Sequence, residues 1–240
     1  MKITLIDAGK RFNRDWIFRH LRYEFLPRQH YAITGPNGSG KSTLLQVIAG
    51  AIAISEGEVR YASGPHSTAK FSSTGGSSAD IPPDQAYRYL SLSAPYLDLV
   101  EEMTALEFLN FHAAFKPFLS SIGIPEILDA VGLVNTEQKQ IRFFSSGMKQ
   151  RLKLAQALFS DTSVILLDEP CTNLDAEGIA LYQQLVRKYG EGRLVILSSN
   201  DPQEYDFCEN RIDIRDYKST LTAGSRSADS GPYTSDRTAD

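Results

Sequence analysis

Short apolar runs and amphipathic stretches alternate along the C-terminal half of the chain. Val164–Leu167 and Leu194–Leu197 are continuous apolar runs, typical of parallel strands that are covered on both faces. Between these runs, apolar side chains follow a helical spacing at Ile179, Tyr182, Leu185 and Val186. Strands that alternate with helices in this way predict an α/β fold with a parallel sheet.

The N-terminal part has a different pattern, made of short runs of strand-forming residues. Ile3–Ile6, Trp16–Phe25 and Tyr31–Thr34 are predicted strands, and Glu56–Tyr61 is predicted to be a turn that runs into a strand. Residues 1–34 are therefore expected to be mostly β.

A mainly helical block is predicted to lie between these β-rich parts. Tyr89–Leu92 is a strand candidate, and Thr104–Phe115 has the pattern of a helix. A second, short helix is expected after Pro125. We therefore place the helical block at residues 95–144, within a domain that spans residues 1–217.

Two stretches lack the apolar residues of a packed core. Residues 63–83 are rich in Ser, Gly, Thr and Pro and predict an exposed loop insertion. Residues 218–240 are polar and predict a disordered tail.

Composition narrows the function classes. The chain has 240 residues, of which 42% are hydrophobic and 22% charged, and a net charge of −4. No stretch is strongly basic, so no nucleic-acid partner is expected, and no apolar run is long enough to span a bilayer. Cys171 and Cys208 have neither metal nor redox spacing, and the first residues do not resemble a signal peptide. A cytoplasmic location is therefore expected, and a separate chain must supply any membrane span.

The strongest chemical signal is a glycine-rich loop between Tyr31–Thr34 and the next helix. Glycines let backbone N–H groups approach phosphate oxygens, Lys41 adds a positive charge for the β- and γ-phosphates, and Ser42 is placed to bind Mg²⁺. The following helix points its positive end at the same anion. The alternative is a glycine-rich turn that matches by chance. The loop fits G-x-x-x-x-G-K-[ST], the phosphate-binding P-loop, and reads Gly35-Pro36-Asn37-Gly38-Ser39-Gly40-Lys41-Ser42-Thr43.

Two further signals support nucleotide chemistry. The run Val164–Leu167 delivers Asp168 to the Mg²⁺ shell and puts Glu169 where a general base could activate an attacking water. Ser145-Ser146-Gly147-Met148 opens another helix, which Ser145 can cap and whose free N–H groups form a second anion site. The alternatives are a common acidic strand exit and a simple helix cap.

In their order along the chain, these motifs resemble those of the ATP-binding subunits of ABC transporters. The order is P-loop, Ser-Ser-Gly-Met signature, Asp168-Glu169-Pro170 and Asn173-Leu174-Asp175, and the resemblance covers residues 1 to about 215. It implies an α/β P-loop NTPase fold with a mainly parallel central sheet, an N-terminal antiparallel β-subdomain and an inserted helical subdomain. It also implies that the protein binds ATP and Mg²⁺ and hydrolyses ATP to energise transport.

The resemblance further implies a dimer of cassettes, made of two copies or of two different chains. ATP would lie between the P-loop of one subunit and the Ser145–Met148 signature of the other. Asp175 matches the family's loop that crosses the dimer seam, and Phe12 matches the aromatic residue that stacks on adenine. For Phe12 the alternative is a packed aromatic at a β-edge. An integral-membrane transporter subunit would hold the cassette at the inner face of the cell membrane.

The chain departs from the family at two positions. The family usually has a Mg²⁺-binding Gln before the helical block, where this chain reads Leu92-Ser93-Ala94-Pro95-Tyr96, and the Ser93 hydroxyl could substitute in part. The family also usually ends the last core strand with a His, where this chain has Asn200. Asn can donate a hydrogen bond but cannot be cationic, so slow hydrolysis is expected. The alternative role of Asn200 is to cap the turn before Pro202.

Two other functions stay open at this point. A soluble ABC-type ATPase that acts on ribosomes or DNA would share the motifs, although such proteins usually carry two cassettes or a long coiled coil. A nucleotide-gated switch that binds ATP and scarcely hydrolyses it is favoured by the missing His and Gln. The presence of Glu169 argues against that switch.

Overall fold

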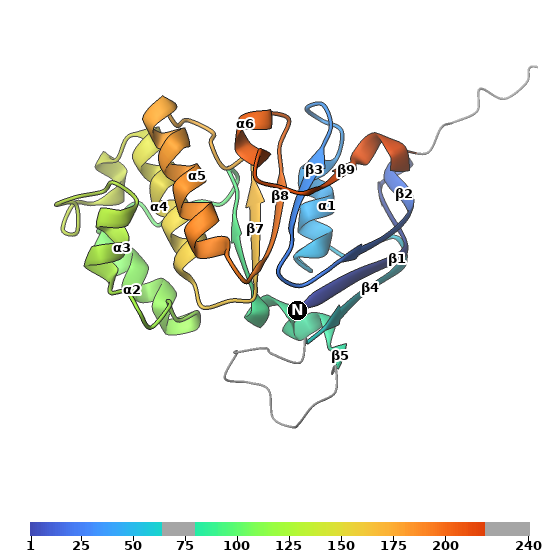
Figure 1. Ribbon diagram of the computed structural model, residues 1–240, viewed down its shortest axis with the longest axis horizontal. Helices are drawn as coiled ribbons and strands as arrows, with labels where there is room; N and C mark the ends of the chain where they lie inside the picture. Colours follow the sequence, from blue (N-terminus) through green and yellow to red (C-terminus); the bar gives the residue numbers. More distant parts are fainter. Residues whose placement is uncertain (64–79, 219–240) are drawn as a thin grey trace, which may run out of the picture.

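Two sheets form the frame of the protein (Figure 1). The computed structural model describes residues 1–63 and 80–218. A four-stranded antiparallel sheet has the order β2-β1-β4-β5, and a five-stranded parallel sheet has the order β6-β7-β8-β3-β9. The expected α/β architecture, with a parallel central sheet and an N-terminal antiparallel sheet, is therefore confirmed.

Most strands coincide with the segments that the sequence predicts. The parallel sheet contains β3 (His30–Thr34), β6 (Leu90–Ser93), β7 (Val164–Asp168), β8 (Leu194–Ser198) and β9 (Asn210–Asp213). The antiparallel sheet contains β1 (Lys2–Phe12), β2 (Asp15–Phe25), β4 (Glu56–Ala62) and β5 (Asp80–Ile81).

The prediction of a loop at residues 63–83 is wrong at its C-terminal end. Ile81 pairs with Tyr61 of β4 and is buried, so residues 80 and 81 form a strand. A 3₁₀-helix, η1 (Pro83–Tyr89), follows at once. The rest of that predicted loop, residues 64–79, and residues 219–240 of the predicted tail lie outside the described residues.

The helices of the described residues lie around the parallel sheet. They are α1 (Lys41–Ile48), α2 (Ala105–Phe115), α3 (Ile124–Ala130), α4 (Ser146–Phe159), α5 (Ala176–Gly190) and α6 (Pro202–Tyr205), with 3₁₀-helices η2 (Ile141–Phe143) and η3 (Ile214–Tyr217). The predicted helical block holds α2, α3 and η2. Within the described residues, no helix combines the length and the apolar character needed to cross a membrane.

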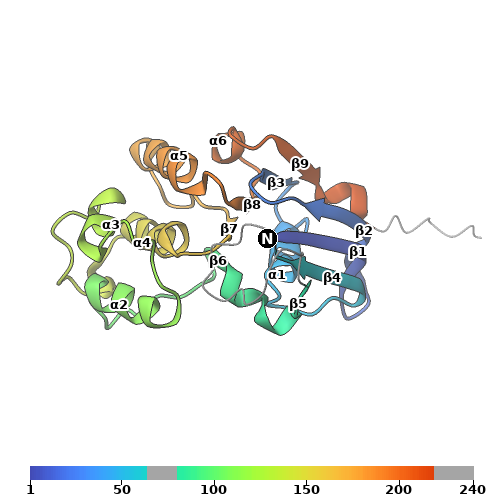
Figure 2. The same cartoon turned by 60° about the horizontal axis from the view of Figure 1, so that its bottom comes forward.

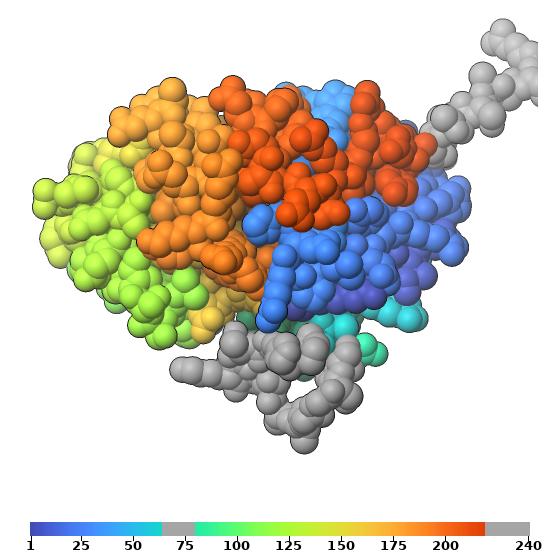
Figure 3. Space-filling view, viewed as in Figure 1, coloured from blue at the N-terminus to red at the C-terminus, as the bar shows by residue number. Residues whose placement is uncertain are grey.

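Alternation along the central strands sorts the core into two layers. Leu166 of β7 packs with α1, whereas its neighbour Leu167 packs with α4 and α5. Every residue of β7 and β8 is buried, which explains why both strands read as continuous apolar runs. In Figure 2, α4 and α5 lie on one side of β7 and β8 and α1 lies on the other. In the space-filling view, α5 and the α6–β9 segment cover the middle of the near face, between the α2–α3 part and the N-terminal strands (Figure 3).

Candidate functional site

The P-loop lies at the carboxyl end of β3, at the upper edge of the molecule in Figure 1. Gly35, Gly38 and Gly40 have φ angles of 140°, 73° and 106°, in the range that favours glycine. A Cβ atom at Gly40 would lie 2.2 Å from Cγ2 of Ile17 on β2. The antiparallel sheet therefore supports the loop so closely that glycine is required at Gly40.

Two buried polar side chains of this loop fit a phosphate ligand. Lys41 is 4% exposed, and its Nζ donates to the carbonyl oxygens of Gly35 at 3.0 Å and Pro36 at 3.3 Å. Ser39 is 2% exposed, and its Oγ has no hydrogen-bond partner among the described residues. An unsatisfied buried hydroxyl costs about 1–3 kcal/mol. A phosphate oxygen in the loop would satisfy this hydroxyl.

Ser42 and Asp168 lie on the same face of the parallel sheet and fit a shared Mg²⁺. Ser42 lies in the first turn of α1. Asp168 ends β7 and alternates with Leu167, so its side chain is on the face that packs against α1. Asp168 is 1% exposed, and its Oδ1 accepts a hydrogen bond from Oγ of Ser198. One hydroxyl and one carboxylate suit Mg²⁺, which keeps several of its ligands from phosphate and water.

Glu169 sits in a strained turn directly after the buried strand. Its φ angle is 41°, which is uncommon for a residue with a side chain. Its N–H donates to the carbonyl oxygen of Ser198 at 2.9 Å, and its own carbonyl accepts from the N–H of Thr172 at 3.1 Å. Such left-handed residues cost about 1–2 kcal/mol and gather at active sites. The turn holds this half-buried carboxylate directly after the end of β7.

Asn200 reaches the P-loop from the end of β8. Its Nδ2 donates to Oδ1 of Asn37 at 3.1 Å. The alternative role as a turn cap is wrong, because the N-cap of α6 is Asp201, which accepts from the N–H of Gln203 at 2.9 Å. The structure therefore brings this amide to the loop that would hold the phosphates.

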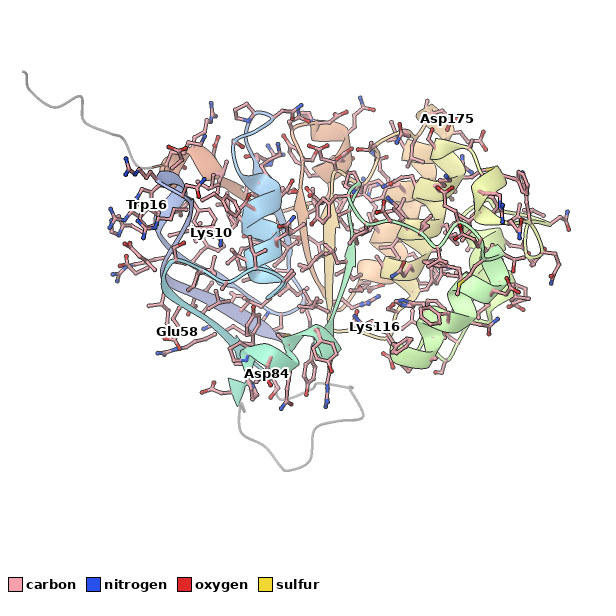
Figure 4. The ribbon with its side chains drawn as sticks, turned by 180° about the vertical axis from the view of Figure 1, so that it is seen from behind. Lys10, Trp16, Glu58, Asp84, Lys116 and Asp175 are labelled. Atoms are coloured by element: carbon pink, nitrogen blue, oxygen red, sulfur yellow. The ribbon has the colours of Figure 1, made fainter. Side chains whose placement is uncertain are left out.

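The second anion site lies at the start of α4. Ser145 caps this helix, as expected, and its Oγ accepts from the N–H of Met148 at 3.2 Å. Asp175 caps α5 and accepts from the N–H of Gly178 at 2.8 Å; Figure 4 shows Asp175 at the upper edge. The two helix starts meet in a hollow of about 290 Å³ lined by Ser145, Ser146, Gly147, Met148, Arg151, Asn173, Leu174 and Asp175.

Arg151 belongs to this hollow, although the sequence interpretation gave it no role. Its guanidinium lies 3.7 Å from Oδ1 of Asp175, and its side chain is 19% exposed. An arginine in the second turn of a helix that starts at a candidate anion site was a signal that could have been used.

The two anion sites are not brought together within one chain. Figures 1 and 2 both show β7 and β8 between α1 with its P-loop and the α4–α5 pair. Both sites nevertheless open at the same edge of the molecule. The P-loop and the Ser145–Met148 signature are therefore separate candidate half-sites.

Phe12 is an exposed aromatic residue at the end of β1. It is 49% exposed, so the alternative of a packed β-edge aromatic is wrong. Nζ of Lys10 lies 4.8 Å from the centroid of the Phe12 ring and donates to the carbonyl oxygen of Ala53. Figure 4 shows Lys10 beside α1, on the side of the molecule that carries the P-loop helix. An exposed aromatic ring fits stacking on a nucleotide base.

Ser93 does not face the metal position. Parallel strands put paired residues on one face, and Ser93 pairs with Leu167, whose side chain packs with α4 and α5. The suggestion that the Ser93 hydroxyl replaces the missing Gln is therefore wrong. Tyr96, in the same loop, interacts electrostatically with Asp168. Burial raises the pKa of Tyr96, a hydrogen bond with Gln46 lowers it, and the Asp168 charge raises it.

Comparisons with known proteins agree with this arrangement. A family model described as ABC transporter matches residues 18–172. The chain is 29% identical over 206 residues to the cytochrome c biogenesis ATP-binding export protein CcmA of Agrobacterium fabrum, covering 84% of this chain and 90% of CcmA. It is 31% identical over 210 residues to the energy-coupling factor transporter ATP-binding protein EcfA1 of Thermotoga maritima, covering 86% of this chain and 75% of EcfA1.

Solved structures share the fold. A putative ABC transporter ATP-binding protein from Pyrococcus furiosus matches with a TM-score of 0.72 at 19% identity, over 91% of this chain and 100% of that one. The dimeric structure of MJ0796, described as a bacterial ABC transporter cassette, matches with a TM-score of 0.71 at 22% identity, over 88% of this chain and 93% of that one. The chain belongs to the family of ABC transporter ATP-binding subunits.

Proposed function

We propose that this protein binds and hydrolyses ATP in a head-to-tail dimer and thereby drives a separate integral-membrane transporter subunit. The observation that carries the proposal is the pair of half-sites. Two anion-binding helix starts, α1 and α4, open at one edge of the chain but on opposite sides of β7 and β8. Two copies placed head to tail would complete both half-sites at once.

Each candidate residue has a distinct task in this proposal. Lys41 exchanges the carbonyl oxygens of Gly35 and Pro36 for phosphate oxygens. Ser42 and Asp168 hold Mg²⁺, which neutralises charge on the β- and γ-phosphates when bound. Glu169 accepts a proton from the attacking water.

The remaining residues complete the site around the nucleotide. Asn200 donates to the γ-phosphate or to the water, and Phe12 stacks on adenine. From the other copy, the N–H groups of Ser145–Met148 bind the γ-phosphate, and Asp175 lies at the seam. A partner subunit in the membrane would place the protein at the cytoplasmic face.

Asn200 also supports a second candidate, a nucleotide-gated switch with weak hydrolysis. A neutral amide at the end of β8 stabilises developing charge less than a cation would, since charge-assisted hydrogen bonds are about twice as strong. Turnover of the purified protein separates the two candidates: steady hydrolysis that Glu169→Gln removes supports the ATPase, and ATP-dependent dimers without turnover support the switch.

A mixing experiment tests the shared site directly. In a Glu169→Gln background, ATP should trap dimers, because the site forms but turnover stops. Adding Lys41→Ala, which removes the P-loop charge, or Gly147→Asp, which puts a negative charge in the signature hollow, should leave each protein monomeric. An equimolar mixture of the two should regain dimers, because one composite site then has an intact P-loop and an intact signature.

The mixture is measured by size-exclusion chromatography with Mg-ATP. The protein that carries Glu169→Gln alone is the positive control. If that control dimerises while the mixture stays monomeric, the shared site is contradicted.

A further inference from the structure

A buried carboxyl group connects the two loops that carry Glu169 and Asn200. Glu204 lies in α6 and is 7% exposed. Its Oε1 accepts a hydrogen bond from the backbone N–H of Cys171 at 3.1 Å, and the hydroxyl of Ser199, the residue before Asn200, also interacts with the carboxyl. Burying a carboxyl costs free energy unless it is hydrogen-bonded, so these two contacts are what stabilise Glu204 at this position.

On one side, Glu204 holds the turn that follows β7. Cys171 is two residues beyond Glu169, inside the turn closed by the hydrogen bond from the N–H of Thr172 to the carbonyl of Glu169. The carbonyl of Cys171 accepts from the N–H of Leu174 at 2.9 Å, next to Asp175. The bond from Glu204 therefore fixes the middle of the segment that runs from the candidate base to the dimer seam.

On the other side, Glu204 belongs to the loop that carries Asn200. Its N–H donates to the carbonyl of Asp201 at 3.0 Å, which ties it to the residue after Asn200. Tyr182 of α5 donates from its hydroxyl to the carbonyl of Glu204 at 2.9 Å. This anchor holds the backbone of α6 without involving the Glu204 carboxyl.

We propose that Glu204 is a positioning residue for ATP hydrolysis, which holds the Glu169 turn in register with the Asn200 loop through the N–H of Cys171. The inference rests on the proposed ATPase function. The carboxyl would not touch the nucleotide; it sets the distance between the base and the amide that face the same phosphate. Burial raises the pKa of Glu204, and the hydrogen bonds with Ser199 and with the N–H of Cys171 oppose this shift because they stabilise the ionised carboxylate.

Two substitutions of similar volume isolate the acceptor. Glu204→Met removes it, and Glu204→Gln keeps a carbonyl oxygen that can accept from the N–H of Cys171. We expect Glu204→Met to lower kcat by about 10- to 100-fold, as a misplaced catalytic group does, and ATP affinity in the Glu169→Gln background to change by less than about 3-fold. Glu204→Gln should restore most of kcat.

Tyr182→Phe is the matched control, because it removes the neighbouring buried hydrogen bond to α6 and leaves the Cys171 contact intact. It should lower the melting temperature and keep kcat within about 3-fold of the unmodified chain. An unchanged kcat in Glu204→Met, or equal losses of kcat in Glu204→Met, Glu204→Gln and Tyr182→Phe, would overturn the inference. Absence of turnover in the unmodified chain would overturn the proposed ATPase function as well, so the two failures are distinguishable.

Discussion

At the scale of single residues, Asn200 is the proposed hydrogen-bond donor whose contribution to hydrolysis can be tested most directly. Its amide already points at the P-loop through Asn37. Removing one donor aimed at developing charge costs about 10- to 1000-fold in rate. We therefore expect Asn200→Ala to lower kcat by that factor with little change in ATP affinity. The pH–rate profile should lack a titration near pH 6.5 from this position, because an amide does not ionise there.

Steady-state ATPase rates check this expectation. Asn210→Ala is a suitable control, since Asn210 hydrogen-bonds to the carbonyl of His30 at the opposite end of β3. A native rate in Asn200→Ala, with the fold intact, would leave the amide without a catalytic role.

Site residues were predictable where a local motif fixes their spacing. They were not predictable where their role depends on which face of a strand the side chain joins. The P-loop glycines and Ser145 could be placed because turn geometry and helix capping are local. Ser93 was misplaced because strand register decides which face a side chain joins, and register comes from pairing with Leu167. Glu204 gave no local signal, since its bond to Cys171 spans 33 residues.

At the scale of elements, the contact between β2 and the P-loop makes a specific prediction. Gly38 and Gly40 both have positive φ angles, but a Cβ at Gly38 would meet nothing within 4 Å, whereas one at Gly40 would clash with Ile17. Gly38→Ala should cost about 1–2 kcal/mol of unfolding free energy from backbone strain alone. Gly40→Ala should cost about 1–3 kcal/mol more, from overpacking.

Urea unfolding measures both costs. Adding Ile17→Ala should recover part of the loss in Gly40→Ala and none of the loss in Gly38→Ala. Equal destabilisation by the two glycine substitutions would contradict the role of Ile17.

The packing of α2 on the end of α4 predicts a pH dependence of stability. Burial, with a smaller contribution from Lys116, lowers the pKa of His112 from 6.5 to about 4. The unfolded chain therefore binds more protons between these values. Stability from this site is fully present above pH 6.5 and is lost as the pH falls toward 4.

The loss should amount to about 1–2 kcal/mol, once residual solvent contact is discounted. Nε2 of His112 lies 2.8 Å from Oγ of Ser160, which itself donates to the carbonyl of Gln156. His112→Asn should flatten the slope of unfolding free energy against pH, measured in urea from pH 7.5 to 5. An unchanged slope in His112→Asn would contradict this assignment.

Helices and strands were predictable in proportion to how much apolar surface each contributes to the core. β7, β8 and α5 have strong patterns because both faces of the strands and one face of the helix are buried. β9 was missed because Ile212 is its one buried residue, and α6 was missed because four residues are too few for periodicity. β5 is fixed by pairing with β4 rather than by its own composition.

At the scale of the whole molecule, the proposed shared site predicts how the rate depends on protein concentration. A single copy holds two half-sites and no complete one. While monomers dominate, the ATPase rate per volume should rise with the square of protein concentration, because each active unit needs two copies. A plot of log rate against log protein concentration should have a slope near 2. The slope should approach 1 as most of the protein becomes dimeric.

Initial rates over a 100-fold range of concentration, with chromatography in parallel, measure this slope. A slope of 1 throughout the range in which the protein elutes as a monomer would show that one copy suffices.

The sequence predicted both half-sites but not their separation. Each depends on a helix start that a short motif identifies, whereas their relative position depends on which face of the parallel sheet each helix covers. Leu166 packs with α1 and Leu167 with α4 and α5, so the two helices lie on opposite faces, and no local motif encodes that choice.

Because the half-sites are separate, the distance between two copies controls the rate of ATP hydrolysis. For two free copies, the chance of meeting is set by how much protein is present. For two copies fixed to one scaffold, it is set by an effective concentration, which reaches about the millimolar range when the tether matches the span and falls steeply when it does not. A scaffold that moves its two attachment points by a few ångströms would therefore switch ATP consumption on or off without touching a nucleotide-binding residue.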